Sequence, residues 1–188
     1  MSVHPEVPEL VTKALRAAWS RGYVHATRTE TGRVLATLAA SRKGTLAECG
    51  CGCGVGAAWL RTGAPDATRV VTAAGNDPDL VTDARDVFTG EGIDVLASDW
   101  SHLHEQGPLS MLVLDADCAR RADREALLEL LAPGGMIVID DLIPCHGWPP
   151  RDSRGIDVMR VEWLTDPRLA SAEILVAEDA AVLVAVRR

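Results

Sequence analysis

Long apolar runs and an excess of positive charge are both missing from this sequence. No apolar run approaches the roughly 20 residues that a membrane-spanning helix needs, so we expect no membrane partner. The chain has 19 Lys and Arg against 27 Asp and Glu, a formal net charge of −8. Nucleic-acid binding depends on clustered cations that displace counterions from phosphates, so we expect no nucleic-acid partner. Residues 1–6 lack the basic and apolar regions of a signal peptide, and the expected location is therefore cytoplasmic.

The five cysteines follow neither a disulfide pattern nor a zinc pattern. Cys49, Cys51 and Cys53 alternate so tightly that they cannot easily bridge one another. Structural zinc sites use a C-x2-C pair that is repeated at a second position, and Cys118 and Cys145 form no such pair. The sequence therefore predicts reduced thiols and argues against zinc.

The length and composition indicate one globular domain. A chain of 188 residues, 47% hydrophobic and 24% charged, is long enough for one buried core and too short for two ordinary domains. We therefore expect a single domain over residues 1–188. Within it, two helices in residues 1–44 are expected to cover the ligand side of a core formed by residues 45–188.

Beyond residue 44, short apolar strands alternate with helical patterns. Strands that are apolar on both faces and separated by helices predict a parallel sheet with helices on each side. Two apolar runs around a short acidic turn then predict a C-terminal antiparallel hairpin. The predicted helices are 7–19, 29–42 with a capping box from Thr27 to Glu30, 56–62, 78–88, 123–131 and 157–164; the predicted strands are 45–48, 68–74, 93–98, 109–116, 136–141, 172–176 and 181–187, with a turn at 133–135.

A glycine-rich segment after the first predicted strand is the expected ligand site. Glycines at positions 50, 52, 54 and 56 leave little side chain between a strand end and a helix start. Such a loop lets backbone N–H groups approach a ligand closely. The dinucleotide fingerprint is also loosely satisfied, by Gly52, Gly54 and Ala57, but it leaves Glu48 unexplained.

The motif Glu48-x-Gly50-x-Gly52-x-Gly54 resembles motif I of class I S-adenosylmethionine-dependent methyltransferases. Together with VLDADC at 113–118 and LLAPGGMIVIDD at 130–141, it looks like the catechol and caffeoyl-coenzyme A O-methyltransferase group. The resemblance implies a Rossmann-like methyltransferase fold, with a mostly parallel seven-stranded sheet, helices on both faces and a C-terminal antiparallel hairpin. It also implies O-methylation of a small-molecule hydroxyl with S-adenosylmethionine as cofactor. Many members of the group are homodimers.

The resemblance implies cofactor contacts at the carboxyl ends of the strands, where ligands bind in this kind of fold. The residues of motif I would hold the amino acid part and the ribose edge, Asp99 would bind the adenine amino group, and Trp100 would pack against the ring. The family's ribose-binding acid falls on Ala74, so Asn76 or Asp77 would have to replace it. The alternative, that this turn only caps the next helix, remains open. The implied cofactor residues are Glu48, Gly50, Gly52, Gly54, Asn76, Asp99, Trp100 and Asp115.

A metal site is implied by three carboxylates at neighbouring strand ends. Asp115, Asp140 and Asp141 provide the oxygen ligands that Mg²⁺ or Ca²⁺ prefers, and in the resembled group these positions bind a divalent metal. The alternative is that Asp115 orients the cofactor while the other two cap a strand and a loop. The catalytic lysine of the metal-dependent group falls on Cys118, so His146, together with Asp115, is the expected catalytic residue.

Three other functions remain open beside a small-molecule O-methyltransferase. The departures at Ala74 and Cys118 are compatible with a methyltransferase-fold protein that binds the cofactor with little or no turnover. A nicotinamide oxidoreductase is disfavoured because the acid expected after the second strand is absent. A base-modifying N-methyltransferase is disfavoured because residues 115–118 do not match its motif.

Overall fold

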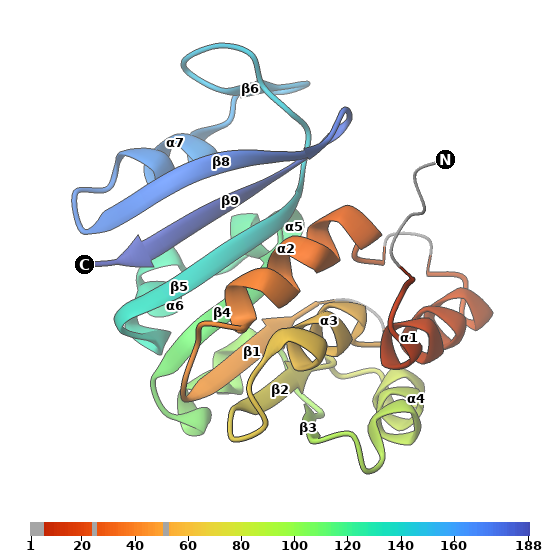
Figure 1. The fold of residues 1–188 in the computed structure, drawn as a ribbon. Helices are drawn as coiled ribbons and strands as arrows, with labels where there is room; N and C mark the ends of the chain where they lie inside the picture. The colour runs from red at the N-terminus through yellow and green to blue at the C-terminus, as the bar shows by residue number, and fades with distance from the viewer. Residues whose placement is uncertain (1–5, 24–25, 51–52) are drawn as a thin grey trace.

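The computed structural model describes residues 6–23, 26–50 and 53–188 and has an α/β architecture built on a seven-stranded sheet (Figure 1). The strands are β1 (Thr45–Cys49), β2 (Arg69–Ala73), β3 (Ile93–Leu96), β4 (Leu109–Asp115), β5 (Leu131–Leu142), β8 (Leu169–Ala177) and β9 (Ala180–Arg187). They lie in the order β3-β2-β1-β4-β5-β9-β8. The first five pair in parallel, and β9 is antiparallel to both of its neighbours. The predicted mostly parallel sheet with a C-terminal hairpin is thus confirmed.

Helices cover both faces of the sheet (Figure 1). One face carries α1 (Glu9–Ser20), α2 (Thr29–Ala39), α3 (Val55–Gly63) and α4 (Pro78–Phe88); the other carries the 3₁₀ helix η1 (Trp100–Gln106), α5 (Ala116–Arg121), α6 (Arg124–Leu130) and α7 (Val158–Thr165). In the part of the chain that the structure describes, none of these helices has the length and apolarity to cross a bilayer.

Two apolar clusters form the core, one on each side of the sheet. On β1, Leu46 packs into the cluster with α1–α4, while Ala47 packs into the cluster with α5–α7. On β4, Val113 packs into the cluster with α1–α4 and Leu114 packs into the cluster with α5–α7. Because successive strand side chains point to opposite faces, a strand buried on both sides must be apolar at nearly every position. This is the pattern that predicted the parallel sheet.

Helices α2 and α3 approach so closely that two glycines are needed between them. A Cβ atom added at Gly63 would lie 1.9 Å from the backbone oxygen of Ala36, and one added at Gly32 would lie 2.1 Å from the Nε1 atom of Trp59. Trp59 itself is 2% exposed. This contact fixes the position of α3, whose N-terminus adjoins the glycine-rich segment.

The start and end of α2 differ from the prediction. The predicted capping box is wrong, because α2 begins after Arg28 and no side chain hydrogen-bonds to its N-terminus. The helix also ends at Ala39 rather than at residue 42. Thr27 instead contributes to the wall of a cavity, which is described below.

Other corrections concern short elements without a clear apolar period. The predicted turn at 133–135 lies within β5, where Gly134 takes a φ of 72° and the pairing with β4 skips from Leu131 to Met136. The elements η1 and α5 were not predicted, nor was the small hairpin of β6 (Arg151–Asp152) and β7 (Gly155–Ile156). Elements this short bury too few residues to show a period in the sequence.

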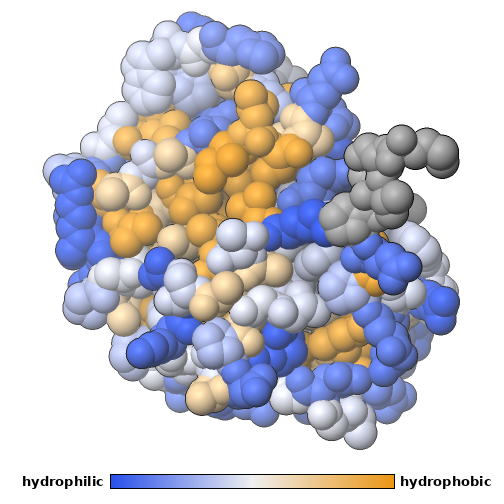
Figure 2. Space-filling model, in the orientation of Figure 1, coloured by the Kyte–Doolittle hydropathy of each residue, from blue (hydrophilic) through white to orange (hydrophobic). Residues whose placement is uncertain are grey.

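The hairpin end of the sheet carries an exposed apolar area. Figure 2, in the orientation of Figure 1, shows hydrophobic residues gathered over β5, β9 and β8. On β8, Ile174 is 38% exposed and Leu175 is 62% exposed. The homodimer implied by the family resemblance stays a prediction, which light scattering in solution can test.

Candidate functional site

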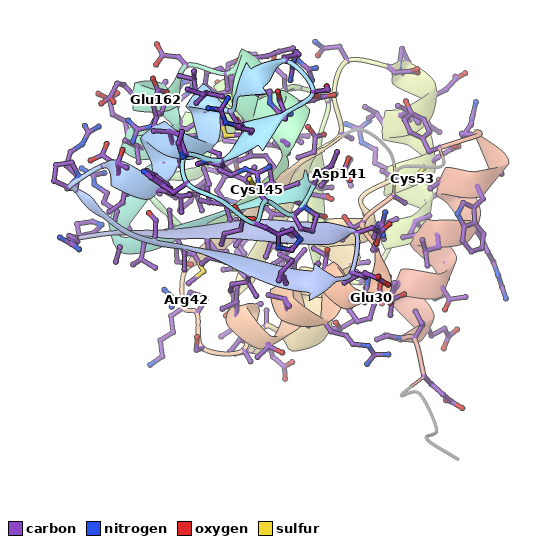
Figure 3. All side chains as sticks on the ribbon, turned by 90° about the horizontal axis from the view of Figure 1, so that it is seen from above. Glu30, Arg42, Cys53, Asp141, Cys145 and Glu162 are labelled. Carbon is purple, nitrogen blue, oxygen red and sulfur yellow. The ribbon has the colours of Figure 1, made fainter. Side chains whose placement is uncertain are left out.

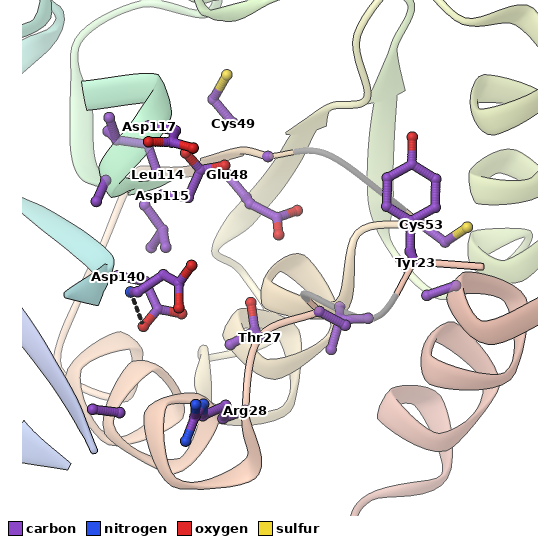
Figure 4. A pocket seen from close by; sticks show the side chains of 18 of the residues that line it. Tyr23, Thr27, Arg28, Glu48, Cys49, Cys53, Leu114, Asp115, Asp117 and Asp140 are labelled. Atoms are coloured by element: carbon purple, nitrogen blue, oxygen red, sulfur yellow. Dashed lines mark hydrogen bonds between the residues drawn. The ribbon is translucent and has the colours of Figure 1, made fainter. Parts of the chain in front are cut away.

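A cavity of about 450 Å³ opens at the carboxyl ends of β1, β4 and β5 (Figure 4). This volume is typical of a site for a small organic ligand. Figure 4 shows Tyr23 and Cys53 on one side of Glu48, and Asp115 and Asp140 on the other. The segment between α1 and α2 and the first turn of α5 complete the wall. The cavity therefore lies at the edge of the sheet where ligands bind in open α/β folds.

Glu48 is buried at the base of this cavity and is held from two sides. Its Oε1 atom accepts the backbone N–H of Gly56 at 3.0 Å, and its Oε2 atom accepts the hydroxyl of Thr72 at 2.8 Å. Gly56 belongs to the first turn of α3, whose N-terminus carries a partial positive charge. The sequence predicted that these N–H groups approach a ligand, but the anion at the start of α3 is the chain's own carboxylate.

Glycines are required around Glu48 for two different reasons. A Cβ atom at Gly56 would lie 2.5 Å from Oε1 of Glu48, so only glycine lets the carboxylate reach the helix. Gly54 takes a φ of 70°, and a Cβ atom there would lie 2.6 Å from the ring of Phe88. Gly50 lines the cavity. The remaining predicted glycine, Gly52, lies outside the described residues.

Replacing Glu48 by glutamine is expected to change how stability depends on pH. Burial raises the pKa of Glu48 above its ordinary 4.5, against the hydrogen bonds that lower it. The folded state therefore binds this proton more tightly than the unfolded state, and stability falls as pH rises from 4.5 through the raised pKa. Glu48→Gln has no such proton, so its free energy of unfolding minus that of the wild type should be larger at about pH 8 than at about pH 4.5.

Chemical denaturation at several pH values measures this difference. Glutamine can still accept the Gly56 N–H, which limits other changes. Burial also raises the pKa of Asp140, but Asp140 is present in both proteins and its effect cancels. A difference that is constant with pH, or that shrinks as pH rises, would contradict the prediction.

Asp115 and Asp140 are brought together as predicted, at paired positions on β4 and β5. Asp115 caps α5 by accepting the N–H of Cys118 at 2.5 Å. Oδ1 of Asp140 accepts the hydroxyl of Thr31 at 3.0 Å and the N–H of Asp141 at 2.7 Å. Both aspartates line the cavity, so the site has an acidic wall opposite Tyr23.

The three carboxylates predicted to bind a metal are not arranged as a metal site. Within the described residues, no group of three His, Cys, Asp or Glu side chains is placed to hold an ion. Asp115 and Asp140 are engaged in the hydrogen bonds given above, and Asp141 takes a left-handed backbone conformation with a φ of 61°. The bond between the Asp141 N–H and Asp140 fits the alternative, in which this pair caps a strand and a loop. The capping of α5 by Asp115 was part of neither prediction, and the role of Asp115 in orienting a cofactor stays a prediction.

The residues predicted to hold adenine and ribose do not line the cavity. Asn76 is exposed, and Asp77 caps α4 by accepting the N–H groups of Asp79 and Leu80, so the capping alternative holds for Asp77. Asp99 is exposed and caps η1 by accepting the backbone N–H of Ser101. The Ser101 hydroxyl also donates to Asp99, and this second bond, followed by the backbone one, lowers the pKa of Asp99. Trp100 is half-buried against the cluster on the α5–α7 face.

His146 is exposed and is not among the described residues that line the cavity. It lies in the segment between the end of β5 at Leu142 and the small β6–β7 hairpin (Figure 3 labels Cys145 in this segment). Arg160 holds the start of that segment by donating to the backbone oxygen of Ile143 at 3.0 Å. The residue predicted to deprotonate an acceptor hydroxyl is therefore not part of the cavity wall that Asp115 and Asp140 line.

Several cavity residues were missed because they lie in segments that read as ordinary loops. Thr27 and Arg28, between α1 and α2, line the cavity, and Arg28 pairs with Asp179 in the β8–β9 turn at 2.7 Å. Arg120 and Arg121 line it from α5. Only the path of the backbone brings these cations beside the acidic wall.

Two cysteines meet beside the acidic wall. The Sγ atoms of Cys49, at the end of β1, and Cys118, in the first turn of α5, are 3.8 Å apart. They are 7% and 9% exposed. The hydrogen bond with Cys118, followed by burial, raises the pKa of Cys49. The predicted reduced thiols are observed for the four cysteines that the structure describes.

Comparisons with known proteins were informative at the level of structure alone. No protein-family profile matches the chain, and no curated protein matches it in sequence. Solved structures match over nearly the whole chain, and all three described below are methyltransferases by name. The fold is therefore that of the Rossmann-like methyltransferases, as the sequence predicted.

Three of these structures illustrate the likeness. An O-methyltransferase from Bacillus cereus in complex with SAH has a TM-score of 0.76 at 18% identity, over 97% of this chain and 92% of that one. The O-methyltransferase TomG from Streptomyces achromogenes, in complex with SAM, has a TM-score of 0.70 at 17% identity, over 97% and 91%. A candidate caffeoyl-CoA O-methyltransferase from Staphylococcus aureus has a TM-score of 0.71 at 14% identity, over 97% and 93%.

Proposed function

We propose that this protein is an S-adenosylmethionine-dependent methyltransferase that acts on a hydroxyl group of a small molecule. The observation that carries the proposal is the position of Glu48, whose carboxylate accepts the Gly56 N–H at the start of α3. In dinucleotide-binding folds that helix start holds a pyrophosphate. Because a carboxylate already lies there, a phosphate group would meet like charge, and a cofactor without phosphates is favoured.

The charge of the cavity supports the same choice. Its acidic residues are Glu48, Asp115, Asp117, Asp140 and Asp141. Its arginines, at positions 28, 120 and 121, are fewer, and Arg28 and Arg120 already pair with carboxylates. A site with an excess of carboxylates favours a cationic ligand. S-adenosylmethionine carries a sulfonium and an ammonium group, and the structural neighbours from Bacillus and Streptomyces are complexes with SAH and SAM.

The catalytic work left to the protein is alignment and the removal of one proton. The cofactor, when bound, supplies a methyl group that is already activated. Asp140 is our candidate base, because it lines the cavity and burial raises its pKa, which lets its carboxylate hold a proton more readily. Asp115, predicted as catalytic, lies beside it. We therefore move the role of base from His146, which lies outside the cavity wall, to Asp140.

Calorimetry with S-adenosylhomocysteine and with NAD tests the cofactor. Binding of the first and not of the second is expected, and preferential binding of NAD would overturn the proposal. A screen of small hydroxyl compounds with labelled S-adenosylmethionine then tests turnover. Tight cofactor binding without transfer to any acceptor would favour the alternative, a cofactor-binding protein with little or no turnover, for which Cys118 in place of the family's lysine is the supporting observation.

Removal of divalent metal is expected to leave methyl transfer unchanged within experimental error. The reason is that Asp115 and Asp140 are engaged by the Cys118 N–H and the Thr31 hydroxyl, and no three-ligand group is present among the described residues. Transfer rates with and without a chelator, with Mg²⁺ added back, measure the effect. A loss of activity that Mg²⁺ restores would show that the carboxylates rearrange to bind an ion.

A further inference from the structure

We infer that Cys49 and Cys118 form a redox-active pair, which a peroxide converts to a disulfide and which thereby reshapes the wall of the cavity. The two sulfur atoms are already in contact at 3.8 Å, although 69 residues separate them in the sequence. Both belong to the apolar cluster on the α5–α7 face. In Figure 4 the side chain of Cys49 points away from Asp140, on the opposite side of β1 from Glu48.

The burial of the pair selects small oxidants. At 7% and 9% exposure, the thiols are accessible to hydrogen peroxide and poorly accessible to bulky reagents. A Cys thiolate attacks one peroxide oxygen, the O–O bond breaks, and a sulfenic acid and one water form. The second thiol then attacks the sulfenic sulfur, the S–O bond breaks, and a second water leaves with the remaining proton. Two thiols lose two electrons and two protons, and the peroxide is reduced to two waters.

Closing the bond must move one side of the cavity. A disulfide requires the sulfur atoms to approach from 3.8 Å to about 2.05 Å. Cys49 lies on β1, which is fixed between β2 and β4 in the centre of the sheet, so the first turn of α5 has to shift. That turn is capped by Asp115, and the residues around Cys118, from Asp115 to Arg121, include much of the acidic and basic wall.

The bond itself is tested in the full chain with Cys51, Cys53 and Cys145 changed to serine, which leaves Cys49 and Cys118 as the only thiols. Hydrogen peroxide is expected to lower the intact mass by two hydrogen atoms and to remove both titratable thiols, and dithiothreitol should restore them. The matched control adds Cys118→Ser and should show no such mass loss. Separate oxidation of each sulfur, or disulfide-linked dimers in place of the internal bond, would overturn the inference.

Wild-type protein provides a second measurement if the triple-serine variant does not fold. Trypsin releases residues 44–61, which contain Cys49, Cys51 and Cys53, and residues 86–120, which contain Cys118, as separate peptides. After oxidation they are expected as one linked species that disappears on reduction, with fragment ions in the mass spectrum that place the link at Cys49. Their continued separation after peroxide treatment would overturn the pairing.

The effect on the cavity rests on the proposed function and is measured separately. S-adenosylhomocysteine is expected to bind the oxidised triple-serine variant about tenfold more weakly than the reduced form. Equal affinity in the two states would overturn the reshaping of the wall. If the wild type and the reduced variant both fail to bind, the proposed function fails, and the mass measurements still decide whether the disulfide forms.

Discussion

Replacing Gly63 by alanine is expected to lower the free energy of unfolding by about 3 kcal/mol. The added methyl group would lie 1.9 Å from the backbone oxygen of Ala36 on the facing helix. That oxygen belongs to the main chain of α2, so it cannot move aside as a flexible side chain could. Alanine is a better helix former than glycine by about 1 kcal/mol at most, and this gain is smaller than the cost of separating the helices.

Chemical denaturation of Gly63→Ala and of a matched variant measures the effect. Gly147→Ala is the control, because a Cβ atom there meets nothing within 4 Å and its φ lies outside the left-handed region. The control should stay within about 0.5 kcal/mol of the wild type. If Gly63→Ala is as stable as this control, α2 and α3 do not pack as closely as described.

Replacing Glu48 by alanine is expected to weaken the binding of S-adenosylmethionine by about 10- to 100-fold. The change removes an acidic group from a cavity proposed to hold a cation, and each 1.4 kcal/mol of attraction lost from the bound state corresponds to about tenfold in affinity. It also leaves the Gly56 N–H and the Thr72 hydroxyl buried without their acceptor, and this cost of about 1–3 kcal/mol falls on the free and the bound protein alike and lowers stability.

Calorimetry on folded protein measures the loss, with Thr72→Val as the matched control. This control removes one hydrogen bond to Glu48 and keeps both the carboxylate and its bond to α3. Its affinity is expected to stay within about threefold of the wild type, because the carboxyl group and its bond to α3 remain in place. Wild-type affinity in Glu48→Ala would show that the glycine-rich segment is not the cofactor site.

The elements that the sequence predicted best are those with a clear apolar pattern. The helix predicted at 78–88 matches α4 at both ends, because Pro78 starts it and its apolar face is buried. The strand predicted at 109–116 ends one residue later than β4. Short elements such as α5 and η1 escaped prediction because their position depends on contacts with the sheet rather than on a local period.

The residues of the candidate site also fall into two groups, those that a local sequence motif indicates and those that it does not. Glu48, Gly50 and Asp115 could be selected as site residues because motif I and the end of β4 are local in the sequence, and all three line the cavity. Their contact with a cofactor stays a prediction. His146 was chosen for its chemistry and its place after a strand, and it lies outside the cavity wall. Thr31, which donates to Asp140, could not be found, because a threonine within a helix carries no sequence sign of a partner 109 residues away.

By itself, the sequence determined the order of the main strands and helices, the parallel sheet and the edge of the sheet at which the cavity opens, because hydrophobic period and glycine spacing are properties of neighbouring residues. Only the tertiary structure decided that Glu48 satisfies the start of α3, that Asp115 and Asp140 meet without a metal-ligand arrangement, and that Cys49 contacts Cys118. These contacts join residues far apart in the chain. Their distances are set by how the strands align and how closely the helices pack, and no local pattern encodes either.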